Sequence, residues 1–283
     1  YALSVHADEI VSEGLWRRKL GASRTAMLFE REGAEVELGP TLRKLVTAAR
    51  FNPRLPYLSF LCINFDAPVV KEAASWFLDG VFLNYNSSYL EQMLEQLLDE
   101  DDSPDVTRFL RAVDVRIDGF RVERAPEWRG QRVFVRHKVS GKAYELRLSE
   151  ESAGTQKLMG LAAYLMTALE RGGTVVVDEL DAKLHPKLLR YVILLFKDPE
   201  VNKSGAQLIF SSQDVSTMRN DVFRRDEIWF AARGEGEASQ LWSLADIHEA
   251  NGNLVSKNAA FDKQYLSGRY GADPYLTRIE EWY

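Results

Sequence analysis

The sequence has few of the residues that cross-link small extracellular domains or hold structural metals. Its 283 residues include one cysteine, Cys62, and four histidines. A single thiol cannot form a disulfide within the chain, so we expect the reducing cytoplasm as its compartment and a buried thiol in the apolar run at residues 57–63. The histidines and the cysteine lack the spacing of metal ligands, which argues against a structural zinc site.

Long apolar runs and an excess of positive charge are also missing. The longest apolar stretches, such as residues 161–169, are far too short to span a bilayer, and no signal peptide is visible. We therefore expect no membrane partner. The formal net charge of −6 argues against a protein that simply coats nucleic acid, although it does not exclude a local basic groove.

Turn-forming residues and apolar periodicity divide the sequence into three predicted parts. Residues 1–66 are predicted to be rich in β-strands, with a hairpin at Glu32-Gly33. Residues 67–114 are predicted to form a helical lobe or insertion, and residues 115–283 the core of the protein. In the first two parts the predicted strands cover residues 26–31 and 35–38, and the predicted helices cover residues 41–50, 68–78, 88–98 and 104–113.

The third part changes from an antiparallel to a parallel pattern. Three alternating segments predict a meander with one wet face, and a long helix then ends at Gly172-Gly173. Strand, helix and strand follow in an order that implies a parallel sheet, with both faces covered. The predicted strands are residues 115–121, 132–139, 144–148, 174–177, 207–210, 228–231 and 240–244, and the predicted helices are residues 155–171 and 187–196.

Polar residues gather where two of the predicted parallel strands end. Asp178-Glu179 follows the first strand, and residues 211–214 follow the second. Ligands of open parallel sheets bind at the carboxyl ends of the strands, so we expect these residues to lie at one edge. Four apolar residues followed by Asp-Glu form a Walker B pattern. Its alternative interpretation is a helix start, since acidic residues favour helix N-termini.

Two neighbouring segments have a functional and a purely structural interpretation. The turn from Ser152 to Thr155 contains Gly154 and precedes a helix, a geometry that suits a phosphate, but it is equally a plain N-cap by Ser152 or Thr155. After the carboxylates, Asp181 either belongs to a functional loop or caps the next helix, with Pro186 in its first turn. His185 alone favours a packed or capping histidine.

The order of these segments resembles the C-terminal half of an ABC-type ATPase, in the branch of SMC proteins, RecF and OLD-family nucleases. The resemblance is greatest to stand-alone prokaryotic AAA/ABC-like ATP-binding proteins, which are often encoded beside nucleases or toxins in anti-phage defence systems. It implies an α/β fold, a P-loop NTPase head of ABC type with a mixed or parallel sheet core, an antiparallel β part and a helical lobe. The segments that carry it are residues 8–13, 28–31, 151–157, 175–186, 208–214 and 265–274.

The resemblance implies a role for each site residue. Ser152 and Gly154 would contact the γ-phosphate of ATP bound by a second subunit of a homodimer or higher oligomer, and Thr155 would belong to the same nucleotide-binding turn. Asp181 would lie in the D-loop that signals between subunits. In the chain's own nucleotide site, Asp178 would serve Mg²⁺ and Glu179 would be the general base. The site residues are Ser152, Gly154, Thr155, Asp178, Glu179, Asp181 and Gln213.

Two departures from the family pattern matter. No G-x-x-x-x-G-K-[ST] loop is present, so nothing in the sequence cradles the α- and β-phosphates. We expect that loop in a segment preceding Tyr1; the alternative is a degenerate or split ATPase. Gln213 stands where the family usually has a switch histidine, and glutamine cannot take a proton at neutral pH, so hydrolysis is expected to be slow.

Three functions follow from the pattern. The first is an ATPase that acts as a switch or sensor across a head-to-tail dimer, in phage defence or DNA maintenance, with a nuclease or toxin effector and with DNA or RNA as a further partner. The second is a scaffold that holds an effector without hydrolysis. The third is a metal-dependent nuclease that uses Asp178, Glu179, Asp181 and Lys183.

Overall fold

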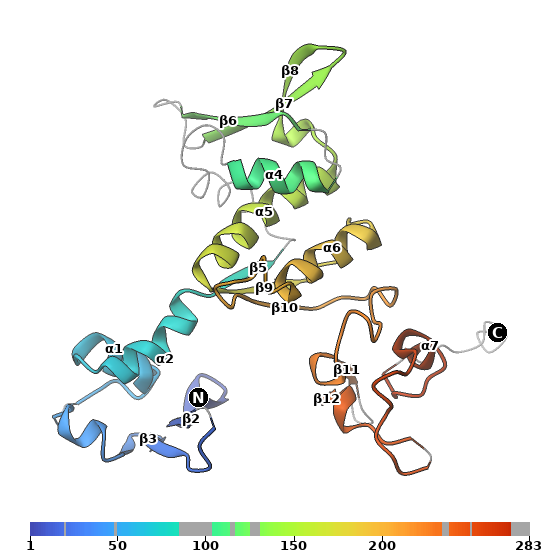
Figure 1. Cartoon of the computed structure of the whole chain (residues 1–283). Helices are drawn as coiled ribbons and strands as arrows, with labels where there is room; N and C mark the ends of the chain where they lie inside the picture. The colour runs from blue at the N-terminus through green and yellow to red at the C-terminus, as the bar shows by residue number, and fades with distance from the viewer. Residues whose placement is uncertain are drawn as a thin grey trace, which may run out of the picture. The chain divides into compact units, whose positions relative to one another are not determined.

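The computed structural model divides the chain into two compact units, Tyr1–Gly80 and Val81–Tyr283 (Figure 1). The described residues are 1–19, 21–47, 50–84, 104–113, 117–124, 131–233, 238–249 and 251–272. The predicted helix at residues 88–98 lies outside these ranges. The predicted boundary after residue 66 falls between two helices of the first unit, and the three-part domain division stays a prediction.

The first unit is an antiparallel sheet with two helices. Its strand order is β1-β2-β3-β4, and the hairpin predicted at Glu32-Gly33 joins β3 to β4 with Gly33 in a left-handed conformation (φ 55°). Helix α2 has the predicted bounds. The elements are β1 (Ala2–His6), β2 (Glu9–Arg17), β3 (Ala26–Glu32), β4 (Glu35–Leu38), the 3₁₀ turn η1 (Leu42–Lys44), α1 (Tyr57–Asn64) and α2 (Pro68–Leu78).

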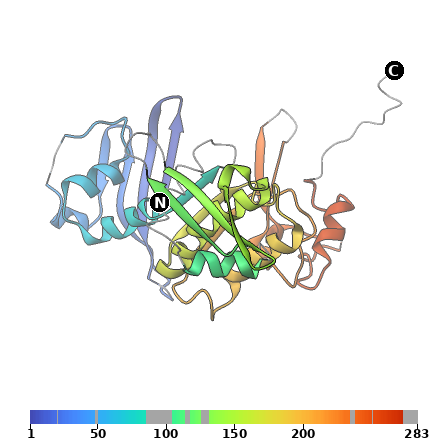
Figure 2. The ribbon, with the colours of Figure 1, turned by 90° about the horizontal axis from the view of Figure 1, so that it is seen from above.

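The helices of the first unit lie along one face of its sheet (Figure 2). Phe29 of β3 packs in one apolar cluster with Leu61 of α1 and Val70 of α2, all three fully buried. The helix predicted at residues 41–50 is wrong. Among the described residues of this range, only Leu42 and Val46 are buried, one turn apart, so packing stabilises a single turn there. Cys62 is half-buried and not fully buried as expected.

The second unit is built on a parallel sheet, as predicted. Its strand order is β10-β9-β5, with both pairs parallel, and α6 connects β9 to β10. The sheet's third strand is β5, which the sequence analysis missed, because only three apolar residues follow Gly80. The elements are β5 (Val81–Asn84), β9 (Thr174–Asp178), α6 (Pro186–Lys197) and β10 (Gln207–Phe210).

The strand predicted at residues 228–231 belongs to a separate ribbon. Strand β11 (Trp229–Arg233) pairs antiparallel with β12 (Ser239–Ser243), and α7 (Phe261–Leu266) packs in the same apolar cluster. Phe230 is buried while its neighbour Trp229 is exposed, which is the alternation of a strand with one wet face. The ribbon therefore does not extend the parallel sheet.

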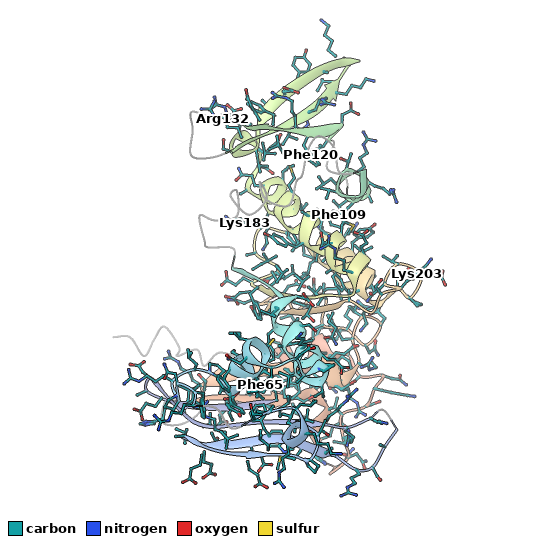
Figure 3. The ribbon with its side chains drawn as sticks, turned by 90° about the vertical axis from the view of Figure 1, so that its left-hand side faces the viewer. Phe65, Phe109, Phe120, Arg132, Lys183 and Lys203 are labelled. Carbon is teal, nitrogen blue, oxygen red and sulfur yellow. The ribbon has the colours of Figure 1, made fainter. Side chains whose placement is uncertain are left out.

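The predicted meander lies over the long helix. Strand order β6-β7-β8 is antiparallel, and its inner residues share a core with α4 and α5; Figure 3 labels Phe109 of α4 and Phe120 of β6 among them. Gly172 ends α5 in a left-handed conformation (φ 82°). The elements are α4 (Pro104–Ala112), β6 (Gly119–Arg124), β7 (Gln131–Val139), β8 (Lys142–Arg147) and α5 (Ala153–Arg171).

One face of the parallel sheet is covered and the other is open. Val175 and Val177 of β9 are fully buried in the core that α5 and α6 share. On the opposite face, Phe82, Val176 and Ile209 are neighbours in register, and Phe82 is 60% exposed. The prediction that both faces are covered is therefore wrong for the described residues. In the part of the chain that the structure describes, no helix is long and apolar enough to cross a membrane.

Candidate functional site

Ser211 joins the ends of β9 and β10. Its hydroxyl donates to Asp178 Oδ1 at 2.5 Å and accepts from the backbone N–H of Glu179 at 2.8 Å. Its carbonyl oxygen accepts from the N–H of Leu180 at 3.0 Å. The carboxyl ends of the two strands therefore meet at one edge of the sheet, and the structure brings Asp178 and Glu179 together there.

Glu179 has a left-handed backbone (φ 52°), which is rare for a residue with a Cβ. A backbone of this kind costs about 1–3 kcal/mol and persists only where the surroundings fix it. Here the N–H of Glu179 is held by Ser211, and the next side chain, Leu180, is fully buried. The chain thus turns sharply directly after the strand and leaves the Glu179 residue exposed.

Asp181 faces the loop that follows β10. Its Oδ1 accepts from the backbone N–H of Gln213 at 3.3 Å, so these two predicted site residues are in contact. The alternative that Asp181 caps the next helix is wrong. His185 is the N-cap of α6, since its Nδ1 accepts from the N–H of Lys187 at 3.2 Å, and Pro186 occupies the first turn as that alternative expected.

Asp214 closes the loop that contains Gln213. Its carboxylate accepts from the Ser216 hydroxyl at 2.8 Å and from the backbone N–H of Thr217 at 2.9 Å. Burial acts to raise the pKa of Asp214, but these hydrogen bonds outweigh it and hold the pKa below its usual range. Asp214 is therefore a charged anchor that fixes the shape of the loop.

The turn before α5 is a capped helix start. Ser152 Oγ accepts from the backbone N–H of Thr155 at 3.1 Å and lies 2.8 Å from the Thr155 hydroxyl. A Cβ added to Gly154 would lie 3.1 Å from the carbonyl oxygen of Lys183, so the turn packs closely on the loop after Glu179. The N-cap interpretation is confirmed, and it leaves the turn exposed at a helix N-terminus.

A cavity of about 480 Å³ opens beside this turn. The N-terminal ends of both α5 and α6 line the cavity. Lys183, which lies on the loop before α6, is labelled in Figure 3. Asp178, Glu179 and Gln213 do not line it, so the predicted site residues form two separate groups. The cavity is lined by Val113, Ser152, Gly154, Thr155, Leu158, Lys183, Leu184, His185, Lys187 and Leu188.

Lys157 contacts the backbone of the candidate site, although its place in the sequence does not predict this. Its side chain is buried, with the residue only 3% exposed, and its Nζ donates to the carbonyl oxygens of Glu179 at 2.8 Å and Ala182 at 2.5 Å. Burial lowers the pKa of Lys157 to about 8, against the opposing charge of Asp181. The signal in the sequence is a lysine among the apolar residues of the helix.

The carboxylate at the sheet edge suits Mg²⁺. This ion is typically held by one or two carboxylates together with substrate phosphates, and Asp178 with the Ser211 hydroxyl offers such a partial set. Among the described residues, no group of three or more Asp, Glu, His or Cys side chains lies close enough to hold a metal.

Comparison with known proteins gives one family match. The family model described as "AAA domain, putative AbiEii toxin, Type IV TA system" matches residues 50–219. A solved structure entitled "Structural biochemistry of ATP-driven dimerization and DNA stimulated activation of SMC ATPases" is similar, with 16% identity, a TM-score of 0.34, and coverage of 49% of this chain and 83% of that chain. No curated protein sequence matches. The predicted α/β fold of a P-loop NTPase is confirmed by the family match.

Proposed function

Because this chain belongs to the family of AAA domains described as "putative AbiEii toxin, Type IV TA system", we propose that it is an ATP-hydrolysing switch whose sites form between two subunits. The observation that carries the proposal is the separation of the site into two groups. Asp178 and Glu179 lie at the sheet edge, whereas Ser152 lines a cavity that neither carboxylate reaches. In a head-to-tail pair, the edge of one subunit would meet the cavity of the other.

The sheet edge supplies the hydrolytic groups in this proposal. Asp178 would hold Mg²⁺, which would neutralise charge on the phosphate oxygens. Glu179 accepts the proton of the water that attacks the γ-phosphorus, while ADP leaves with the electron pair of the broken P–O bond. Ser211 orients both residues through its hydroxyl, and Asp181 holds Gln213 close to them. Gln213 cannot accept a proton, so we propose slow turnover.

The cavity supplies the groups that recognise phosphate. Ser152 and the free N–H groups at the start of α5 provide donors and the positive end of a helix dipole. Lys183 and Lys187 add two charges from the facing loop and helix. We propose that the terminal phosphate of ATP held by the other subunit enters here, so that ATP draws two copies together.

The loop that grips the α- and β-phosphates is not among the 283 residues. Among the described residues, the apolar face of the parallel sheet that carries Phe82 and Ile209 is exposed. Parallel strands are normally covered on both faces, and a helix that follows a phosphate loop would bury this one. The ATPase experiments below therefore use the intact natural protein that carries this sequence.

A mixing experiment tests the shared site. Ser152→Asp keeps an N-cap oxygen but sets a negative charge against the phosphate, and we expect it to lower ATP turnover about a hundredfold. Glu179→Gln removes the base. In a mixture of the two inactive variants, half of the dimers contain one site with neither substitution, so turnover recovers to about a quarter of the wild-type value.

The matched control for the mixing experiment is Ser152→Asn, a neutral N-cap of similar size that should retain most turnover. Recovery of steady-state ATPase activity on mixing, measured after subunit exchange, is the expected result. No recovery, with dimers shown to exchange, would mean that Ser152 and Glu179 of one subunit serve the same nucleotide, and the head-to-tail arrangement would be wrong.

The partners of the switch are also part of the proposal. The family description names a toxin and a toxin–antitoxin system, and we propose that this chain acts in the cytoplasm to control a nuclease or toxin effector in phage defence. Calorimetric titration with Mg-ATP separates the switch from a scaffold that does no chemistry. Tight binding of Mg-ATP by this chain would contradict the scaffold.

A second candidate function, contact with nucleic acid, is favoured by the outer face of the meander. Strand register places five cations and two anions on this face, although the whole chain carries −6. Arg121 lies over the ring of Phe134 at 4.4 Å and donates to Glu145 at 3.0 Å, so the test of this face uses Lys138 and Arg147. The charged residues of the face are Arg121, Glu123, Arg132, Arg136, Lys138, Glu145 and Arg147.

Salt-dependent binding tests this surface. We expect the chain to bind a DNA or RNA duplex at low salt, and Lys138→Gln or Arg147→Gln to weaken binding and lower the slope of log K against log salt concentration by about 1 each. Lys203→Gln, an exposed lysine in the loop after α6 (Figure 3), is the control and should leave the slope unchanged. Equal slopes for all variants in fluorescence anisotropy would exclude the meander as the contact surface.

A further inference from the structure

A buried lysine links the helix that starts at Ser152 to the backbone of the catalytic residue. Lys157 lies on the second turn of α5 and is 3% exposed. Its Nζ donates to two carbonyl oxygens, those of Glu179 and Ala182. These carbonyls begin and end a tight turn that closes with the hydrogen bond from the N–H of Ala182 to the carbonyl of Glu179 at 3.0 Å.

This turn needs outside support. Glu179 in this turn and Lys183 directly after it both have left-handed backbones, at φ 52° and 63°, which residues with a Cβ adopt only where the surroundings fix them. The ammonium group of Lys157 gains charge-assisted hydrogen bonds there, which are stronger than neutral ones. Burial disfavours the charged form of Lys157, and the two carbonyl oxygens replace part of the hydration that the ammonium group loses.

A second contact joins the same two elements. The carbonyl oxygen of Lys183 would lie 3.1 Å from a Cβ at position 154, so Gly154 permits the first turn of α5 to approach the loop. The loop is therefore fixed to α5 at two points, at Gly154 and at Lys157. A displacement of the start of the helix would carry the backbone of Glu179 with it.

We infer that Lys157 is a positioning residue that holds the Glu179–Ala182 turn in its hydrolytic conformation and ties it to the helix that starts at Ser152. The inference rests on the proposed function for its catalytic meaning. Under that function the Ser152 turn meets the nucleotide of one site and Glu179 serves the other, so Lys157 couples the two sites of a dimer. The group acts only through the backbone and touches no reacting atom.

The test compares Lys157→Met with Lys157→Arg in the intact natural protein. Methionine fills the volume without charge, and we expect kcat for ATP to fall about a hundredfold while KM stays within about twofold, because the base is displaced but the nucleotide is still held. Arginine can reach both carbonyls and should restore part of kcat. Thr167→Val, which removes a hydroxyl donating to the Ala163 carbonyl of the same helix at 2.9 Å, is the control and should leave kcat unchanged.

Hydrogen exchange separates this inference from the proposed function. In Lys157→Met, the N–H groups of Ala182 and Leu184, which are bonded within the loop, should exchange at least about tenfold faster, while those of residues 161–169 keep their protection. This readout holds even if the wild-type protein hydrolyses no ATP, an outcome that would contradict only the proposed function. Unchanged exchange in the loop and unchanged kcat would overturn the positioning role. If the methionine variant does not fold, Lys157→Gln takes its place: faster loop exchange with a reduced kcat in that variant supports the positioning role, and wild-type values of both overturn it.

Discussion

Replacing Glu179 with glutamine should lower the rate of ATP hydrolysis about 10²- to 10⁴-fold, because a positioned general base contributes a factor of this size. The substitution preserves the shape of the side chain. It also leaves intact the backbone contacts that hold the residue, from its N–H to Ser211 and from Lys157 to its carbonyl. In the part of the chain that the structure describes, no hydrogen bond to the Glu179 carboxylate is present, so the change removes a base and no structural contact.

The measurement is single-turnover hydrolysis in the intact natural protein, with Glu170→Gln as the control. Glu170 is an exposed carboxylate near the end of α5, and its loss should change the rate less than twofold. ATP binding by Glu179→Gln should equal that of the wild type, so the ATP-bound dimer should accumulate. Turnover of Glu179→Gln near the wild-type rate would exclude Glu179 as the base.

The central strand and the long helix could be predicted because their patterns are strong and local. Residues 174–177 are β-branched and apolar, and the residues from 155 to 171 repeat at helical spacing over five turns, ending at Gly172. A parallel sheet then follows from the order of the elements. Strand β5 escaped prediction because its three apolar residues provide too short a pattern. It forms a strand because it pairs with β9 beside Val175 and Val177. This pairing is a long-range contact that local patterns do not contain.

The sequence predicts which individual residues are candidates for the site. It does not predict which of them lie together in the fold. Local chemistry identified Ser152 and Asp178 as candidates, whereas only the fold shows that Ser152 shares a cavity with Lys183 and Lys187 and that Asp178 does not. Lys157 was missed for a related reason. A lysine in an amphipathic helix normally reaches solvent, and its partners here lie 22 and 25 residues away.

The first unit contains a buried ion pair, which, like the buried Lys157, cannot be predicted from local sequence patterns. Glu13 and Arg31 lie on neighbouring strands, and both side chains are fully buried. Glu13 accepts from Arg31 at 3.1 Å and from the first backbone N–H groups of α1, at 2.6 Å from Tyr57 and 2.8 Å from Leu58. It therefore replaces the cap that Pro56 cannot provide to this helix.

The Arg31 guanidinium holds the loop that leads into α1. It donates to the carbonyl oxygens of Gly33 at 2.7 Å and Leu55 at 2.8 Å, and to that of Pro53, and it lies 4.9 Å from the centre of the Phe51 ring. Each of these hydrogen bonds goes to a backbone carbonyl of the first unit. These bonds therefore offset the hydration that the buried guanidinium loses. Removing one partner leaves the other buried without its counter-charge.

Arg31→Met should therefore destabilise the first unit by about 3–5 kcal/mol, because the Glu13 carboxylate stays buried without its counter-charge. The measurement is hydrogen exchange of the β2 and β3 amides in increasing urea, which reports on this unit alone. Arg17→Met is the matched control, since the Arg17–Glu72 pair is exposed and its loss should cost less than about 1 kcal/mol. The double variant Arg31→Met with Glu13→Gln should be less destabilised than the sum of the two single changes, because neither charge then remains buried alone. Equal losses for Arg31→Met and Arg17→Met would show that the buried pair does not hold α1 to the sheet.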